Sequence, residues 1–239
     1  MTETTGASND KRDRLEILER VSAEPPRVHP EAPGGWAWRT SRTCYEFLAA
    51  EVAPGYRTLE TGAGLSTVLF AAWGCVHTAV VPSQAQADTL EQYCSDKGFD
   101  TGGLTFDVRP SERGLPALLD DGPLDLILID GGHSFPLPVI DWFYGAARLR
   151  AGGVAVFDDV PLPAVGILLN EYLDRDPRWE RIAGTRRWRA YRRHSEGTLS
   201  EHESNQLFFR GPVPQLRDRI AWRTAALLPA RLRRRVLPQ

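Results

Sequence analysis

Hydrophobic residues change their spacing along this chain, and the changes mark out its secondary structure. Between residues 57 and 157, short and mostly apolar runs alternate with segments whose apolar residues recur every three or four positions. The runs predict strands and the segments between them predict helices. The predicted strands are Arg57–Thr61, Val76–Val81, Leu104–Val108, Leu124–Ile129 and Val154–Phe157, and the predicted helices are Leu65–Trp73, Gln84–Lys97, Val139–Leu149 and Val165–Leu173. Strands separated by helices favour a mostly parallel sheet.

The two ends of the chain add further elements. Trp179–Ala183 and Trp188–Arg192 flank a short polar turn and predict an antiparallel hairpin at one edge of the sheet. Before the sheet, Asp10–Val21 and Thr40–Val52 have helical spacing, while residues 1–9 are expected to be a disordered tail. We therefore divide the chain into a tail, helix and Pro-rich loop (1–35), an α/β domain (36–195) and an Arg-rich helical extension (196–239).

Composition narrows the class of protein. The chain has 239 residues, enough for one α/β domain, and its net charge of -2 gives no reason to expect a nucleic acid partner. Three widely spaced cysteines match no zinc pattern, and the polar N-terminus is not a secretory signal. No apolar run is long enough to span a membrane, so we expect a cytoplasmic protein.

A glycine turn follows the first predicted strand. It reads Glu60-Thr61-Gly62-Ala63-Gly64 and leads into a helix that Ser66 or Thr67 can cap. Glycines let the backbone approach a ligand closely, and the Glu60 carboxylate suits a cationic amino group better than a phosphate. The turn lacks the third glycine of a dinucleotide-binding loop. The alternative is a plain turn with a solvated glutamate.

Acidic residues follow the fourth and fifth predicted strands. The fourth leads into Asp130-Gly131-Gly132-His133 and the fifth into Asp158-Asp159. If these strands are neighbours, the side chains face one point beyond the sheet, where carboxylates could bind Mg²⁺. A histidine there can accept a proton near neutral pH. The simpler alternatives are a loop cap for Asp158-Asp159 and a structural role for His133.

These motifs together resemble a known group of enzymes. Glu60-Thr61-Gly62-Ala63-Gly64-Leu65-Ser66-Thr67, Asp130-Gly131-Gly132-His133-Ser134-Phe135 and Phe157-Asp158-Asp159 resemble "family 24" class I S-adenosylmethionine-dependent methyltransferases and the metal-dependent sugar O-methyltransferases of the macrocin and novobiocin type. The resemblance implies a Rossmann-like, mostly parallel seven-stranded sheet with helices on both faces. It also implies S-adenosylmethionine as methyl donor and a small-molecule acceptor, such as a sugar or secondary metabolite.

The resemblance also assigns roles to individual residues. The cofactor site would comprise Glu60, Gly62, Gly64, Ser66, Ser83, Ser111 and Asp130; the metal site, holding Mg²⁺, would comprise Asp130, Asp158 and Asp159. His133 and Asp130 become the catalytic candidates, since Gly132 stands where the relatives often have a second acid. Trp38 precedes the first predicted strand and is either a cover for the cofactor or a packing anchor.

One departure from the family pattern leaves other readings open. The second predicted strand ends in Val80-Val81-Pro82-Ser83, without the acid that usually binds the ribose hydroxyls, so Ser83 is the expected substitute. A binding or scaffold protein without turnover, or a nucleotide-sugar or dinucleotide enzyme, are the alternatives. The Arg-rich extension is either a basic amphipathic surface or a self-association face that would make a homodimer.

Overall fold

A computed structural model describes residues 3–28 and 39–195 of this chain, with side chains from residue 10 onward. Residues Met1–Leu199 form one compact unit, and a second unit, Ser200–Gln239, lies outside the described residues. The predicted Arg-rich helices and Trp38 therefore also lie outside them. Among the described helices, none is long and apolar enough to cross a membrane.

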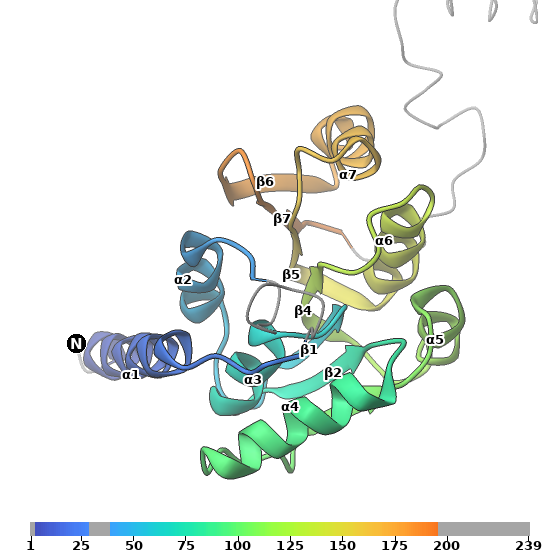
Figure 1. The fold of residues 1–239 in the computed structure, drawn as a ribbon. Helices are drawn as coiled ribbons and strands as arrows, with labels where there is room; N and C mark the ends of the chain where they lie inside the picture. Colours follow the sequence, from blue (N-terminus) through green and yellow to red (C-terminus); the bar gives the residue numbers. More distant parts are fainter. Residues whose placement is uncertain (1–2, 29–38, 196–239) are drawn as a thin grey trace, which may run out of the picture. The chain divides into compact units, whose positions relative to one another are not determined.

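Seven strands form a single sheet in the order β3-β2-β1-β4-β5-β7-β6 (Figure 1). They are β1 (Arg57–Thr61), β2 (Val76–Val80), β3 (Leu104–Asp107), β4 (Leu124–Ile129), β5 (Leu149–Phe157), β6 (Trp179–Gly184) and β7 (Arg189–Arg193). β1 to β5 are parallel, whereas β7 runs antiparallel to both β5 and β6. The predicted parallel sheet with an antiparallel hairpin at its edge is thus confirmed.

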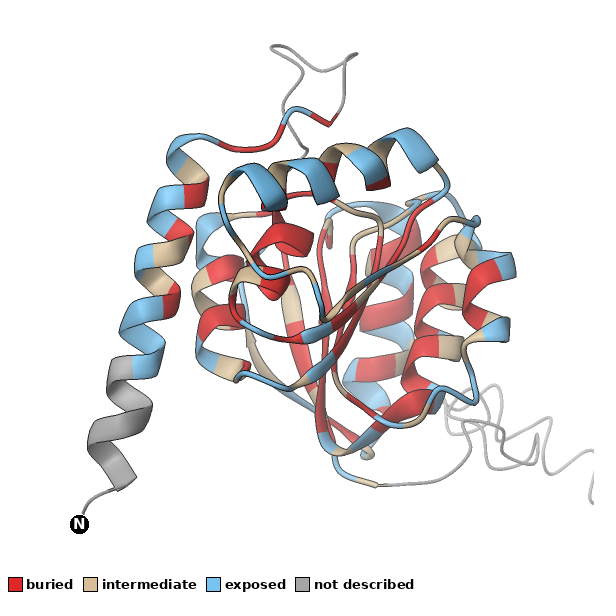
Figure 2. Ribbon diagram, turned by 90° about the horizontal axis from the view of Figure 1, so that it is seen from below, coloured by how far each residue is buried: buried red, intermediate tan, exposed pale blue. Residues whose placement is uncertain are grey.

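Helices cover both faces of this sheet. They are α1 (Glu3–Ala23), α2 (Arg42–Glu51), α3 (Leu65–Ala72), α4 (Gln84–Asp96), α5 (Ser111–Ala117), α6 (Leu137–Arg148) and α7 (Pro163–Ile167), followed by the π-helical turn η2 (Leu168–Tyr172) and the 3₁₀ turn η3 (Leu173–Arg175). Figure 2 shows that their buried residues turn toward the sheet and their exposed residues toward solvent.

The central strand β4 divides the core in two because its successive side chains point to opposite faces. Leu126 and Leu128 pack with buried residues of α1 to α4, whereas Ile127 and Ile129 pack with those of α5 to α7. This explains why residues 126–129 of β4 form an uninterrupted apolar run in the sequence. β1 lies between β2 and β4, so the strand order reverses at the β1–β4 junction, where α/β sheets form their ligand crevice.

Several element boundaries differ from prediction. The first helix begins at Glu3, so the expectation of a disordered tail over residues 1–9 is wrong. Leu18 and Val21 anchor this helix in the core, and an anchored helix extends by one hydrogen bond per added residue even through weak helix formers. α5 was not among the predicted helices, because seven residues containing a proline carry too little periodicity.

The segment around β5 also differs. β5 begins at Leu149 rather than Val154, because Gly152 adopts a positive φ of 79° and the strand passes through Gly152-Gly153 with an irregular register. The following helix begins at Pro163 rather than Val165, as proline suits a first helical turn, and it continues as η2 and η3 instead of one regular helix.

Side-chain contacts join helix α2 to the β6–β7 hairpin. The indole nitrogen of Trp188 donates to Thr43 Oγ1 at 3.0 Å, and Arg192 forms an ion pair with Glu51 at 3.0 Å. Trp188 is itself buried among the residues of this face of the core. The second helix and the last strand thereby hold one another in place.

Candidate active site

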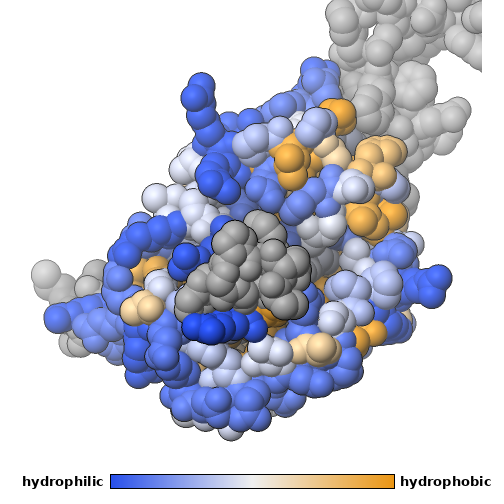
Figure 3. Space-filling view, viewed as in Figure 1, coloured by the Kyte–Doolittle hydropathy of each residue, from blue (hydrophilic) through white to orange (hydrophobic). Residues whose placement is uncertain are grey.

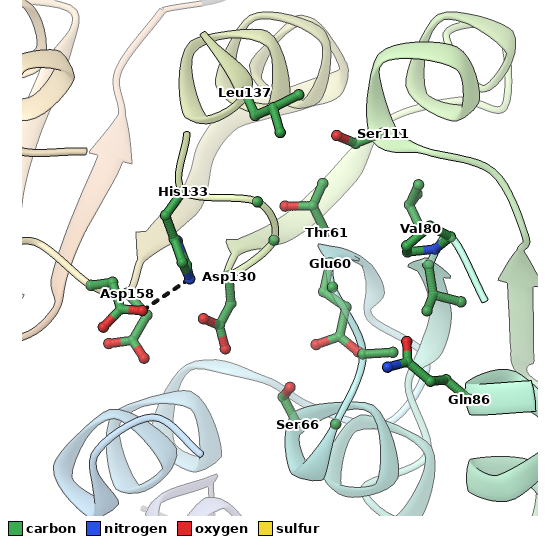
Figure 4. A pocket seen from close by; sticks show the side chains of 18 of the residues that line it. Glu60, Thr61, Ser66, Val80, Gln86, Ser111, Asp130, His133, Leu137 and Asp158 are labelled. Atoms are coloured by element: carbon green, nitrogen blue, oxygen red, sulfur yellow. Dashed lines mark ion pairs between the residues drawn. The ribbon is translucent and has the colours of Figure 1, made fainter. Parts of the chain in front are cut away.

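A cavity of about 720 Å³ opens at the carboxyl ends of the parallel strands (Figure 4). Residues that follow β1, β2, β4 and β5 line it, together with the first turns of α3 and α5 and the β6–β7 turn. A volume of this size is typical of small-molecule sites. Glu60 and Asp130, which the sequence placed on separate motifs, both line this one cavity.

Gly62 brings the two motifs into contact. It has φ of 87°, and a Cβ at this position would lie 2.5 Å from the main-chain oxygen of Asp130. Its N–H donates to the Val80 carbonyl at 3.0 Å, and the Asp130 N–H donates to the Thr61 carbonyl at 3.2 Å. Glycine is required here both by the backbone conformation and by the close approach of the β4 loop.

Glu60 is almost completely buried, with 1% of its surface exposed. Its Oε1 accepts hydrogen bonds from the Thr67 hydroxyl and lies 3.2 Å from His77 Nε2. On the other side of the imidazole, His77 Nδ1 lies 2.8 Å from Thr58 Oγ1. The predicted cofactor carboxylate is therefore held from behind by β2 and α3, and not solvated as the plain-turn alternative required.

Asp130 stands at the end of β4 and is half-buried. Burial raises its pKa well above the usual range, and the negative charges of Asp158, Glu60 and Asp159 raise this pKa further. A cationic ligand or a metal ion placed between these carboxylates would relieve the repulsion. The site is thus electrostatically prepared for positive charge.

His133 and Asp159 face each other across the cavity, with Nε2 and Oδ2 3.0 Å apart, a contact that is an ion pair only when the imidazole is protonated (dashed in Figure 4). Asp159 has a φ of 51°, an uncommon conformation for a residue other than glycine, which aspartate tolerates better than most. Asp130, His133 and Asp159 each offer a ligand atom, and these three atoms all lie within 4.8 Å of one another.

This group differs from the predicted metal triad in one member. Asp158 lines the cavity but does not belong to the three-residue group, whose third member is His133. Asp158 is 4% exposed and its Oδ1 has no hydrogen-bond partner within the described residues. Burial raises the pKa of Asp158, and the hydroxyl of Thr40 lowers it again in part. Adjacent residues after a strand point in different directions, which sequence spacing alone does not resolve.

The predicted serines separate into two groups. Ser66 and Ser111 line the cavity, Ser66 on α3 and Ser111 at the start of α5. Ser83 does not: its hydroxyl caps α4 by accepting from the Gln86 N–H at 3.4 Å, and Gln86 lines the cavity instead. Ser83 is therefore not among the described residues that line the cavity, because it caps the helix and Gln86 lies there one turn further on.

Sequence reasoning missed two buried polar residues behind the cavity wall. His77 lies on β2 opposite Thr58, a relation that depends on strand register. Asp141 on α6 is fully buried, and neither of its carboxylate oxygens has a hydrogen-bond partner within the described residues. Burial raises the pKa of Asp141, while the nearby hydroxyls of Ser111 and Thr61 lower it in part. The sequence did contain a signal for Asp141, because this acidic residue interrupts the apolar pattern of a predicted helix near its start.

Comparison with known proteins now bears on this geometry. Residues 59–160 match the model of a family described as a methyltransferase domain. This segment, less than half of the chain, is similar to methyltransferase domains. The match spans β1 to β5 and includes both motifs, so the resemblance seen in the sequence is confirmed. No curated protein sequence matches the chain.

Solved structures of methyltransferases share the fold. The cofactor-bound protein Rv0187 from MTB has a TM-score of 0.52 and 19% identity, covering 81% of this chain and 90% of its own. The O-methyltransferase TomG from Streptomyces achromogenes, in complex with SAM, has a TM-score of 0.50 and 19% identity, covering 62% and 77%. An rRNA methylase from Streptococcus thermophilus has a TM-score of 0.50 and 15% identity, covering 66% and 98%.

These likenesses establish the fold. The chain also spans only 46% of the length of another matching structure, TrmN from Thermus thermophilus. Because proteins of this fold act on different kinds of acceptor, the reaction and its substrate have to be argued from the site itself.

Proposed function

We propose that this protein transfers a methyl group from S-adenosylmethionine to an oxygen atom of a small molecule. The observation that carries the proposal is the joint position of Glu60 and the Asp130–His133 loop on one cavity at the switch point of a methyltransferase domain. One half of the cavity suits the donor and the other half suits the acceptor.

The donor half is formed by the turn between β1 and α3. Glu60 would bind the cationic amino group of the methionine part, and Gly62 and Gly64 would allow the backbone to lie against the donor. Ser111 and Gln86, further along the cavity, would contact the nucleoside. A carboxylate attracts a sulfonium donor, whereas it would repel the pyrophosphate of a dinucleotide, so this half favours the methyl donor over NAD.

The acceptor half is formed by the loops after β4 and β5. In the transfer, a lone pair of the acceptor oxygen forms the bond to the methyl carbon, and the bond from that carbon to sulfur breaks with its electrons going to sulfur. The hydroxyl proton has to leave, and a neutral His133 would accept it at Nδ1, since Asp159 contacts the other ring nitrogen, Nε2. Asp159 would then stabilise the resulting imidazolium.

The spacing of Asp130, His133 and Asp159 also favours a second role for these side chains, as ligands of a metal ion. Asp130, His133 and Asp159 would hold a divalent cation, since two carboxylate oxygens and one imidazole nitrogen form a suitable donor set. A bound cation would lower the pKa of an acceptor hydroxyl. His133 would in that case be a ligand rather than a base, which makes metal dependence a decisive measurement.

Charge on the cavity wall favours a small molecule over RNA as the acceptor. Among the residues that the structure describes, five acidic and two arginine residues line the cavity: Glu60, Glu112, Asp130, Asp158, Asp159, Arg39 and Arg187. An excess of negative charge repels a phosphate backbone.

Hydrophobic residues gather on the face over α6 and α7 (Figure 3). Phe135, in the loop after β4, is 72% exposed, and Ile167, on α7, is 58% exposed. An acceptor with an apolar part suits this surface.

The test begins with the donor. We expect isothermal titration calorimetry to show binding of S-adenosylhomocysteine, and Asp130→Asn to weaken it. Absence of binding at high micromolar concentration, or tighter binding of NADH, would refute the proposal. Transfer of labelled methyl groups to hydroxylated small molecules, with ribosomal RNA as a parallel acceptor, tests the second half. Binding without transfer to either acceptor would favour a scaffold protein.

A further inference from the structure

We propose that His77 is a positioning residue for the donor site and that it acts through Glu60. This rests on the proposed function, because it assumes that Glu60 contacts the donor. The structure joins the two residues in a buried chain of hydrogen bonds that runs from the glycine turn through His77 on β2 back to Thr58 on β1, and each link has a definite direction.

The chain begins at the glycine turn. The Gly64 N–H donates to Thr67 Oγ1 at 2.9 Å, which leaves the hydroxyl hydrogen of Thr67 free to donate to Glu60 Oε1. Within the described part of the chain, both hydrogen-bond contacts of the Glu60 carboxylate use Oε1. The second oxygen, Oε2, is thereby left for a ligand in the cavity that Glu60 lines.

The chain continues through the imidazole. His77 Nε2 lies 3.2 Å from Glu60 Oε1, and an ionised carboxylate can only accept, so Nε2 carries the hydrogen. In the neutral ring Nδ1 then accepts from the Thr58 hydroxyl at 2.8 Å. A neutral ring leaves the full negative charge of Glu60 for a cationic ligand, whereas a protonated ring would cancel it.

Packing holds the imidazole in this orientation. His77 is fully buried, and its ring stacks on Phe70 of α3 with centroids 4.6 Å apart and planes inclined by 25°. The ring cannot turn away without losing both its hydrogen bonds and this contact. Because Thr67 and Phe70 lie on the same helix, α3 fixes Glu60 directly through a hydroxyl and indirectly through the imidazole.

Variants that preserve the packing around His77 can distinguish a positioning role for this residue from a purely structural one. His77→Phe retains a stacked ring but loses the donor, and we expect it to weaken S-adenosylhomocysteine binding about 10-fold or more, as for a lost hydrogen bond to a charged group. Thr58→Val, which removes only the outermost link, should weaken binding by a smaller factor. Tyr191→Phe is the control, since it loses a hydrogen bond to Asp174 far along the sheet and should leave binding unchanged.

A double variant tests whether His77 acts through Glu60. If it does, His77→Phe should change binding by less than a factor of two when Glu60 is already glutamine. Equal factors in both backgrounds would overturn the proposal, as would wild-type affinity in His77→Phe. If His77→Phe does not fold, Thr58→Val carries the test, because it removes a hydrogen bond made to His77, and wild-type affinity in this variant overturns the proposal.

The ring itself provides a readout that needs no ligand. Nitrogen-15 NMR of the wild-type protein, with His77 assigned by the spectrum of the His77→Phe variant, should show a hydrogen on Nε2 and none on Nδ1. A doubly protonated ring or a hydrogen on Nδ1 alone would overturn the proposal. If wild-type protein shows this ring state but binds no S-adenosylhomocysteine, the proposed function fails while the hydrogen-bond chain stands.

Discussion

The two halves of the cavity are built differently. On the donor side, Glu60 and His77 are 1% and 0% exposed and every contact is fixed by neighbouring elements of the core. On the acceptor side, the His133 and Asp159 side chains are 36% and 32% exposed and lie on loops. A site that binds one constant cofactor can be rigid before binding, whereas loops set the choice of acceptor.

The donor side should therefore tolerate change least. We expect Gly62→Ala to abolish S-adenosylhomocysteine binding and to lower the free energy of unfolding by about 3 kcal/mol, because its Cβ would collide with the Asp130 carbonyl and its φ is 87°. Calorimetry and urea unfolding measure the two effects.

Gly98→Ala is the matched control for this change. Gly98 has φ of 70° but no atom within 4 Å of an added Cβ, so we expect about 1 kcal/mol of strain and unchanged binding. Equal losses in the two variants would mean that the contact between the glycine turn and the β4 loop is unimportant.

On the acceptor side, a substitution should lower the rate of methyl transfer without weakening the binding of the donor. We expect His133→Asn to reduce kcat about 100-fold while leaving the affinity for S-adenosylhomocysteine within a factor of about two, since a general base contributes in this range. His194→Asn is the control, because His194 also pairs with a carboxylate, Glu180 at 3.0 Å, but does not line the cavity. A kcat as low in the control would contradict the assignment.

Metal removal sharpens the same comparison. If a cation occupies the three-residue group, EDTA should lower methyl transfer about 10-fold or more, Mg²⁺ should restore it, and donor binding should change little. Asp159→Asn should then impair the response to Mg²⁺ more than Asp158→Asn, because Asp158 is not a member of the group. Full activity in EDTA would leave His133 as a base.

The smallest effect concerns the buried Asp141 behind both halves. Burial raises its folded-state pKa above the value of about 3.9 in an unfolded chain, so its contribution to stability is lost as pH rises through the folded pKa. We expect Asp141→Asn to raise Tm by about 2–4 °C at pH 7 and to have no advantage below about pH 4.

Thermal unfolding between pH 4 and pH 8 measures this effect. Asp125→Asn should act in the opposite direction, since Asp125 accepts from the Arg57 N–H at 2.8 Å and pairs with Arg150 at 2.7 Å. An Asp141→Asn variant that is less stable than wild type at pH 7 would show that the carboxylate is satisfied in the folded protein.

Most of the fold could be predicted from the spacing of hydrophobic residues, because strands such as β4 are buried on both faces and leave an apolar run, here residues 126–129. Residues at strand ends, such as Glu60 and Asp130, were also found from sequence, since the ends of parallel strands converge by topology. His77 was not, because its partner depends on the register between β1 and β2. Ser83 was misplaced because a capping residue and a cavity residue have the same sequence signature.

The bond between Trp188 and Thr43 joins residues 145 positions apart in the chain. A shortened protein that started at β1 would retain the whole matched segment, yet it would expose the Trp188 indole and remove two of the four helices, α1 and α2, that pack on one face of the sheet. Anyone trimming this protein for crystallisation should therefore keep the second helix, even though no residue of it touches a ligand in the proposed chemistry.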